Sequence, residues 1–369
     1  MRILHVYKSY YPEVYGGVPQ AIRHLVHGCA EHGIESEVFT LSANAADDPI
    51  TFEGHRVTQA KTSVEVASTP LSIEAFSKFR KIAPQFDVIH YHYPYPFGDL
   101  LYLHGGRSIP SIVTYHCDIV RQRFLKHVYY PLQTVFLKSV DRIICTSTNY
   151  MDTSPVLQQF LYKTEAISLG LNKEAFPMAS PEAIKRWTDH TAEPFILFLG
   201  VVRNYKGIET LIEAAKGFQF KLLIAGSGKN LDQLKETARN AKLNNIDFVG
   251  SVNEDDKAAL LELCTALVLP SHFRSEGFGL VQLEAAMKKK PLICTDLGTG
   301  TSYVNEHKNT GLVVLPKDVD ALRDAMNFMM YHPKISKNMG IAAETRFKEL
   351  FTAKLMCENY ARIYKDVVA

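Results

Sequence analysis

The chain has 369 residues, of which 46% are hydrophobic and 22% are charged, with a formal net charge of +2. This size favours more than one globular domain, and the small net charge argues against a nucleic-acid-binding protein. No apolar run is long enough for a transmembrane helix and the six cysteines are scattered, so we expect a cytoplasmic protein with buried thiols.

The first half of the chain alternates short apolar runs with amphipathic stretches. The apolar runs predict strands at 2–7, 34–41, 87–91, 110–115 and 142–146. The amphipathic stretches predict helices at 18–32, 72–83, 124–139 and 149–160. This alternation is typical of a parallel sheet with helices on both faces.

The same alternation begins again after a polar, proline-containing stretch between Asn172 and Glu193. Further strands are predicted at 194–200, 219–225, 246–249, 266–269 and 291–294. Further helices are predicted at 207–216, 229–242, 255–263, 279–289, 318–330 and 353–368. The repeat predicts an α/β protein with two doubly wound domains, residues 1–172 and 173–352.

A glycine-containing loop follows the first predicted strand, where open α/β sheets bind their ligands. It runs from Tyr11 to Pro19 and contains Gly16 and Gly17. Adjacent glycines let the backbone approach a ligand closely, and the N-terminus of the next helix favours an anion. The same residues also fit a plain turn, so the sequence leaves open whether this loop binds a phosphate or only turns the chain.

A basic loop follows the first strand of the second half and opens a helix. It runs from Gly200 to Gly207 and carries Arg203 and Lys206. Positive charge at a helix N-terminus is unfavourable with the helix dipole, and a bound diphosphate would relieve that cost. The alternative is a solvated basic loop without a ligand.

Two acidic residues follow the apolar strand at 266–269. Glu276 precedes a helix and has glycines at 277 and 279 beside it, whereas Glu284 lies inside the helix among apolar neighbours. A carboxylate in such a place needs a partner, and the paired hydroxyls of a sugar or ribose suit it. The alternative is an exposed helix residue and a capping acid.

These motifs resemble those of the retaining GT-B glycosyltransferases of family four. Glu276 and Glu284, with seven residues between them, are similar to the E-x7-E motif of that family, and Gly200 to Gly207 is similar to its G-x-x-x-x-K-G segment. Weaker similarities extend the resemblance to almost the whole chain: Gly16–Gly17, the H-x-D of His116–Asp118, a hinge at 168–172 without its proline and aspartate, and a segment at 298–304 that lacks the acid of the family.

The resemblance implies two Rossmann-like domains that face each other across a cleft, with the acceptor on the first and the donor on the second. It also implies that the last helix, 353–369, packs back on the first domain. Similar proteins need no divalent metal, so we expect Arg203 and Lys206 to hold the diphosphate, together with backbone amides of the loops. Those amides belong to Gly16, Gly17, Gly277, Phe278, Gly279, Leu280 and Val281.

The remaining carried-over roles concern the sugar and the nucleoside. Glu276 would bind hydroxyls of the transferred sugar, and Glu284 would bind the ribose. His116 would lie near the sugar and help to position it or to stabilise developing charge. The backbone at Ser251 and Val252 would face the base. Arg203, Lys206, Glu276 and His116 are thus the expected catalytic residues.

The expected reaction retains the anomeric configuration by front-face attack, with Glu276 as a covalent nucleophile as the less favoured route. The segment at 298–302 looks like that of bacterial mannosyltransferases of surface polysaccharide (O-antigen) assembly, so we expect GDP-mannose as donor and a glycan or lipid-diphosphate-linked sugar as acceptor. A UDP-hexose is the alternative donor. A nucleotide-sugar epimerase and a non-catalytic nucleotide-sugar-binding protein are the other function classes.

Two further patterns have weaker interpretations. His90 and His92 would lie on one face of a strand, but without a third ligand in view the pattern does not favour a metal site. The stretches Leu71–Phe86 and Arg121–Tyr130 mix basic and apolar residues. They fit either a peripheral contact with the anionic inner face of the cell membrane or solvated helices.

Overall fold

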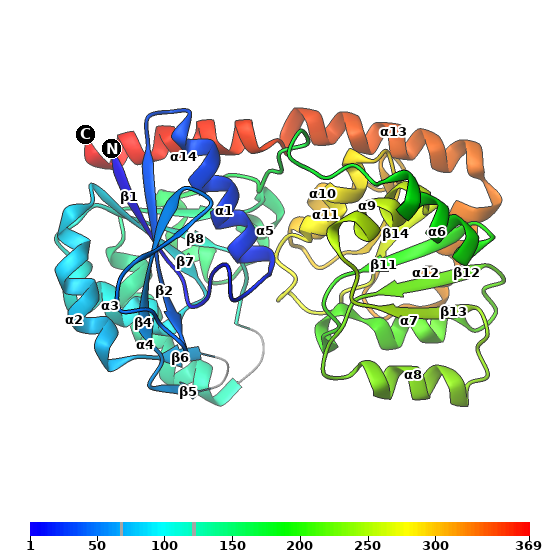
Figure 1. The fold of residues 1–369 in the computed structure, drawn as a ribbon, viewed down its shortest axis with the longest axis horizontal. Helices are drawn as coiled ribbons and strands as arrows, with labels where there is room; N and C mark the ends of the chain where they lie inside the picture. The colour runs from blue at the N-terminus through cyan, green and yellow to red at the C-terminus, as the bar shows by residue number, and fades with distance from the viewer. Residues whose placement is uncertain (67–68, 120–122) are drawn as a thin grey trace. The chain divides into compact units, whose positions relative to one another are not determined.

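The computed structural model describes residues 1–66, 69–119 and 123–369, which divide into two compact units. The first unit contains residues 1–170 together with 353–369, and the second contains residues 171–352 (Figure 1). From the sequence we expect the division after residue 172, and the structure has it after residue 170.

A mixed sheet forms the centre of the first unit, in the strand order β10-β9-β8-β7-β1-β2-β4-β3. Its strands are β1 (Arg2–Val6), β2 (Glu35–Ser42), β3 (Ile50–Phe52), β4 (His55–Lys61), β7 (Val88–Tyr93), β8 (Ser111–Tyr115), β9 (Arg142–Cys145) and β10 (Thr164–Ala166). Neighbouring strands are parallel except for β3 and β4. The chain leaves β1 first towards β2 and later towards β7, so the strand order reverses between β1 and β7.

Helices cover this sheet, and a separate two-stranded antiparallel sheet is formed by β5 (Val64–Val66) and β6 (Thr69–Leu71). The helices are α1 (Gly17–Ala30), α2 (Ile73–Ile82), α3 (Pro96–Leu101), α4 (Arg123–Ser139), α5 (Thr148–Thr153) and α14 (Ala353–Val368). Figure 1 shows α14 alongside α1. A Cβ atom at Gly28 would lie 2.4 Å from Sγ of Cys357, so the close packing of these two helices requires a glycine there.

The sheet of the second unit is parallel throughout, in the order β13-β12-β11-β14-β15-β16. Its strands are β11 (Phe195–Leu199), β12 (Lys221–Ala225), β13 (Ile246–Gly250), β14 (Ala266–Leu269), β15 (Leu292–Thr295) and β16 (Gly311–Val314). This is the strand order of the Rossmann fold, and its switch point lies between β11 and β14. Buried strands such as Phe195–Leu199 are continuous apolar runs because helices cover both faces.

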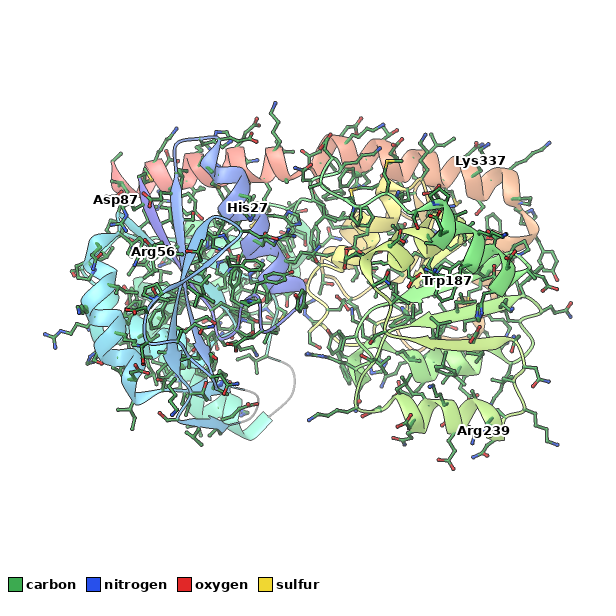
Figure 2. The ribbon with its side chains drawn as sticks, viewed as in Figure 1. His27, Arg56, Asp87, Trp187, Arg239 and Lys337 are labelled. Carbon is green, nitrogen blue, oxygen red and sulfur yellow. The ribbon has the colours of Figure 1, made fainter. Side chains whose placement is uncertain are left out.

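The helices of the second unit are α6 (Pro181–Thr191), α7 (Ile208–Ala215), α8 (Leu231–Asn240), α9 (Glu254–Leu263), α10 (Leu280–Met287), α11 (Gly300–Val304), α12 (Val319–Tyr331) and α13 (Pro333–Leu350). Trp187 on α6, labelled in Figure 2, donates its indole N–H to Asp256 on α9 at 2.7 Å. This bond joins the two helices, which pack together.

Two sequence-based expectations are wrong in detail. The polar stretch between Asn172 and Glu193, for which no helix is predicted, contains α6. This helix begins at Pro181, and the hydroxyl of Ser180 caps its N-terminus. The predicted helix at 149–160 is divided into α5 and the 3-10 helix η3 (Leu157–Lys163). Ser154 is extended there, because a residue before a proline disfavours the helical conformation.

The cysteines are mainly interior, as the sequence predicts. Five are buried, and Cys117 is partly exposed. Burial raises the pKa of Cys145 and Cys294 to about 12 and that of Cys264 to about 11. Within the described ranges, we find no helix with the length and apolar character needed to span a bilayer.

Candidate active site

The loops that follow β11 and β14 meet at the switch point of the second sheet, which is where such sheets bind ligands. The first of them carries Arg203 and Lys206, and the second carries Glu276. Gly207 joins the two loops closely: a Cβ atom there would lie 1.9 Å from the carbonyl oxygen of Pro270. Its φ of 71° also favours glycine.

Lys206 and Glu276 form an ion pair inside this site. Nζ of Lys206 lies 2.5 Å from Oε2 of Glu276, and the hydroxyl of Ser271 donates to the same oxygen at 3.0 Å. The two charged side chains are only 12% and 9% exposed. Burial opposes the charged ammonium, but the carboxylate of Glu276 outweighs it and raises the pKa of Lys206 above its usual value.

Arg203 has a different environment from Lys206. Its side chain is exposed and takes part in no ion pair within the described part of the chain. The next helix, α7, begins after Gly207 without a side-chain cap. Its first N–H groups and the guanidinium of Arg203 therefore supply positive charge that an anion can use.

The backbone around Glu276 is held against the start of α11. Thr299 donates its hydroxyl to the carbonyl of Glu276 at 2.9 Å, and the N–H of Gly300 donates to the carbonyl of Gly277 at 2.8 Å. A Cβ atom at Gly300 would lie 2.4 Å from the ring of Phe278. The carbonyl groups of this loop are thus used in folding, and the loop is closely packed.

Helix α10 begins directly after this loop. Gly279 precedes it with a φ of 79° and gives no side-chain cap. The N–H groups of Leu280 and Val281, in the first turn, have no acceptor within the helix. This arrangement agrees with the expectation that amides here can meet a phosphate, which stays a prediction.

Glu284 is buried in α10 and has its own cation. Nζ of Lys257 on α9 lies 3.3 Å from Oε1 of Glu284 and 2.7 Å from Oε2 of Glu254. Burial lowers the pKa of Lys257, and the carboxylates of Glu284 and Glu254 more than compensate, so its pKa is raised. The two glutamates of the E-x7-E motif therefore have separate partners in the ligand-free protein.

Ser251 and Val252, expected near the base, follow the end of β13. Ser251 is exposed and Val252 is partly buried. Gly250 before them has a φ of 74° and turns the chain at the end of the strand. The two residues lie at the carboxyl end of the sheet, which is the edge that also carries Lys206.

Gly16 and Gly17 lie in the first unit, where Gly16 precedes α1 and Gly17 is its first residue. The N-terminus of α1 has neither a side-chain cap nor an acidic residue in its first turn. Glu13 holds the loop against the sheet, because its Oε1 accepts from Ser42 at 2.6 Å and from Gln59 at 3.1 Å. The helix start thus remains suited to an anion.

His116 also lies in the first unit, directly after β8, and is 6% exposed. Its Nε2 lies 3.0 Å from Nδ1 of His92. Burial lowers the pKa of His116 to about 3, so its imidazole is neutral at physiological pH. Asp118 accepts hydrogen bonds from Tyr115 at 2.8 Å and Ser154 at 2.9 Å, which gives this carboxylate a role in the fold.

His90 and His92 share one face of β7, as the sequence predicts, and His5 on β1 joins them. The ligand atoms of the three lie within 4.8 Å of one another. His90, however, uses both ring nitrogens, bonding to Tyr364 and to Thr114 at 2.7 Å each. The geometry therefore favours a hydrogen-bonded cluster over a metal site.

The structure thus brings Lys206 into contact with Glu276 and leaves Glu284 to Lys257. The sequence motifs do not predict three residues that contact this set, Lys257, Ser271 and His5. Lys257 lies in an ordinary charged helix and His5 in an ordinary strand, and only packing and strand register show their partners.

Two family models match the chain. The model described as Glycosyl transferases group 1 matches residues 162–346, and that of Glycosyltransferase Family 4 matches residues 15–153. D-rhamnosyltransferase WbpZ of Pseudomonas aeruginosa is 44% identical over 96% of this chain and 93% of its own length. The O-antigen chain mannosyltransferase C of Escherichia coli is 41% identical over 100% of this chain and 99% of its own.

Solved structures agree on the fold. Sucrose-phosphate synthase from Thermosynechococcus elongatus superposes with a TM-score of 0.82 at 21% identity, over 99% of this chain and 98% of its own. Alr3699/HepE of Anabaena, in complex with UDP, gives a TM-score of 0.78 at 17% identity, over 99% and 100%. With these matches, the two Rossmann-like units and the E-x7-E site, the chain belongs to the group 1 and family 4 glycosyltransferases and has the GT-B fold.

Proposed function

We propose that the protein transfers mannose from GDP-mannose, with retention of configuration, to a glycan or lipid-diphosphate-linked sugar in O-antigen assembly. The observation that carries the proposal is the buried pair of Lys206 and Glu276 at the switch point of the second sheet. The choice of sugar is supported by the 41% identical relative from Escherichia coli, named an O-antigen chain mannosyltransferase.

The two cations of the β11 loop act on the leaving group. When the sugar–phosphate bond breaks, negative charge grows on the diphosphate, and fixed positive charges stabilise it most in the transition state. Lys206 remains protonated because its pKa is raised, and the guanidinium of Arg203 supplies the second positive charge. The incoming diphosphate replaces Glu276 as the partner of Lys206, which leaves the carboxylate to accept hydrogen bonds from sugar hydroxyls. These two residues supply the charge that a divalent metal would otherwise supply.

The other end of the donor binds to α10 and its neighbours. Glu284 accepts hydrogen bonds from the ribose hydroxyls, and Lys257 pairs with the same carboxylate. The backbone of Ser251 and Val252 faces the base. The N–H groups at the start of α10 bind the diphosphate.

Retention follows from attack on the face that the diphosphate leaves. The bond between the anomeric carbon and the diphosphate oxygen breaks, the acceptor oxygen bonds to the same face, and the departing diphosphate takes the acceptor proton. Glu276 is assigned a binding role, because its carboxylate accepts the hydroxyl of Ser271 and, once the diphosphate has taken Lys206, the hydroxyls of the sugar. His116 contacts the transferred sugar.

D-rhamnosyl transfer is the second candidate, since a relative of that name is 44% identical. D-rhamnose is mannose without the C6 hydroxyl, so the two donors share every other group. A UDP-hexose is the third. These alternatives differ in the donor and leave the roles of the charged residues unchanged.

A donor panel tests the proposal. The protein is incubated with GDP-mannose, GDP-D-rhamnose, UDP-glucose and UDP-galactose, with and without a lipid-diphosphate-linked sugar. Acceptor-dependent GDP release from GDP-mannose, and an α-mannoside by NMR, are expected. Nucleotide release from a UDP-sugar and not from GDP-mannose would overturn GDP-mannose as the donor. A β-linked product would overturn retention of configuration. Conversion of the donor sugar without nucleotide release would indicate an epimerase.

We also propose peripheral contact with the anionic inner face of the cell membrane. Val128, Tyr130 and Val135 on α4 are exposed, and Arg80 and Lys81 are exposed on α2. Of the stretch from Arg121 to Tyr130 named above, the first two residues lie outside the described ranges. Co-flotation with phosphatidylglycerol vesicles, lost at high salt, is expected. Absence of binding at low salt would overturn the contact.

A further inference from the structure

Three histidines from neighbouring strands form a hydrogen-bonded row inside the first unit. Nδ1 of His5 lies 3.1 Å from Nε2 of His92, and Nδ1 of His92 lies 3.0 Å from Nε2 of His116. The ring planes differ by only 23° and 20° along the row. The centroids of the paired rings lie 5.4 and 5.3 Å apart, which is too far for face-to-face contact and matches rings that meet edge to edge through these nitrogens. Each contact therefore lies nearly in the plane of both rings, where the N–H group and lone pair of an imidazole lie.

The row ends at the edge of the sheet where ligands bind. His5 and His92 belong to β1 and β7, the two strands on either side of the switch point. His116 follows the carboxyl end of β8. It is 6% exposed, whereas His5 is 0% and His92 is 1% exposed. The row thus connects a fully buried ring to a residue at the ligand-binding edge.

All three rings are neutral at physiological pH. Burial lowers the pKa of His5 and of His116 to about 3, and it lowers that of His92 well below its usual value. A neutral imidazole has one N–H donor and one acceptor nitrogen. His92 therefore donates in one of its two bonds and accepts in the other, so both bonds of the row run in the same direction.

The far end of the row decides the direction. Nε2 of His5 is buried and has no hydrogen-bond partner in the described part of the chain. If the bonds ran from His116 to His5, this nitrogen would carry the proton, and a buried N–H without an acceptor is rarer than an unused acceptor. The bonds therefore run from His5 through His92 to His116, which places the proton of His116 on Nδ1.

We propose that His5 and His92 are positioning residues that hold His116 in its Nδ1–H tautomer, so that it presents a fixed N–H donor to the sugar. The inference rests on the proposed function for the identity of that ligand. The tautomer itself is a property of the ligand-free protein and is measured without turnover.

His90 provides a matched control. It lies on the same strand and face as His92, is equally buried, and stacks on His92 with ring centroids 4.2 Å apart. Its hydrogen bonds go to Tyr364 and Thr114, outside the row. A substitution at His90 therefore removes a comparably buried imidazole and leaves both hydrogen bonds of the row in place.

NMR of the full chain with 15N-labelled histidine measures the tautomers, because long-range couplings distinguish protonated from unprotonated ring nitrogens. In the unsubstituted protein, His116 is expected to be protonated at Nδ1. His92→Phe is expected to add an Nε2–H population at His116, and His90→Phe is expected to leave it unchanged. A His116 protonated at Nε2 in the unsubstituted protein overturns the proposal, and so does an unchanged His116 in folded His92→Phe.

Kinetics then connect the tautomer to the reaction. His92→Phe is expected to lower kcat about tenfold and to change the KM for GDP-mannose by less than about twofold. The reason is that the N–H group of His116 acts mainly on the transition state. Unchanged kcat with a changed tautomer would overturn the role towards the sugar. If the unsubstituted protein were inactive with every nucleotide sugar but His116 had the expected tautomer, the proposed function would be refuted and the hydrogen-bonded row would stand.

Discussion

Burying two opposite charges together gives little net stability, since the lost hydration offsets most of their attraction. The pair of Lys206 and Glu276 is nevertheless almost completely enclosed. In the proposed mechanism the pair contributes preorganisation: Lys206 is held in place before the substrate arrives, so little rearrangement is needed during the reaction. The separate pair of Glu284 and Lys257 would preorganise the proposed ribose contact in the same way.

Lys206→Ala tests the leaving-group role. We expect kcat to fall about 100-fold while the donor KM changes less than about threefold, because the ammonium acts mainly on charge that appears in the transition state. Steady-state nucleotide release measures both constants. Lys185→Ala, at an exposed position on α6, serves as control. A raised KM at unchanged kcat would contradict the role.

Glu284→Gln tests ribose binding. The substitution keeps the shape of the side chain and removes its charge, and we expect the Kd for GDP to rise about tenfold, or about 1.4 kcal/mol. Isothermal titration calorimetry measures the affinity. Glu254→Gln is a matched control, because Glu254 binds the same lysine but is 72% exposed. Equal losses in both variants would show that Lys257, not the ribose contact, is responsible.

At the scale of elements, β1, β7 and β8 enclose neutral histidines that the unfolded chain would protonate in acid. Burial holds the pKa of His90 well below the usual value, as it does for His5, His92 and His116. Their contribution to stability is complete above the unfolded pKa of about 6.5. It is lost as the pH falls towards the folded pKa values, because the unfolded state then binds more protons.

His90→Phe measures this effect. Each such histidine makes the free energy of unfolding fall by about 1.4 kcal/mol per pH unit below about pH 6. Between pH 6 and pH 5, we expect the free energy of unfolding of the variant to fall less steeply than that of the unsubstituted protein, by about 1.4 kcal/mol per pH unit. This difference in slope does not depend on the stability of the variant at pH 7. Urea unfolding at several pH values gives the slopes.

At the scale of the whole molecule, bound nucleotide should stabilise the folded chain. GDP at about 100 times its Kd adds about 2.7 kcal/mol to the stability of the part that binds it. We expect GDP to raise the unfolding temperature more than UDP at equal concentration, measured by thermal shift. A larger shift with UDP would contradict the proposed donor.

The sequence predicts much of this fold because its signals are local. Apolar runs locate β11 and β14, and the glycines beside Glu276 and the apolar neighbours of Glu284 predict a loop residue and a helix residue, as observed. The helix α6 is hidden in a polar stretch, because only one of its faces is buried.

The rest depends on contacts between segments far apart in the chain. The partner of Glu284 is Lys257, 27 positions away, and His5 meets His92 across 87 positions. Such pairs follow from strand register and helix packing, which no short motif records. The local motifs therefore predict the class of site, and the tertiary fold determines its charge balance.

The interior position of most thiols makes the protein convenient to label. Five cysteines are buried, and burial raises the pKa of Cys145, Cys264 and Cys294, which suppresses the reactive thiolate. A brief maleimide treatment of the folded protein should therefore modify Cys117 first, with one adduct by peptide mass spectrometry; several adducts at once would contradict this. Because Cys117 adjoins His116, a fluorophore there would test, without any engineered cysteine, whether a sugar binds at this edge of the sheet as proposed.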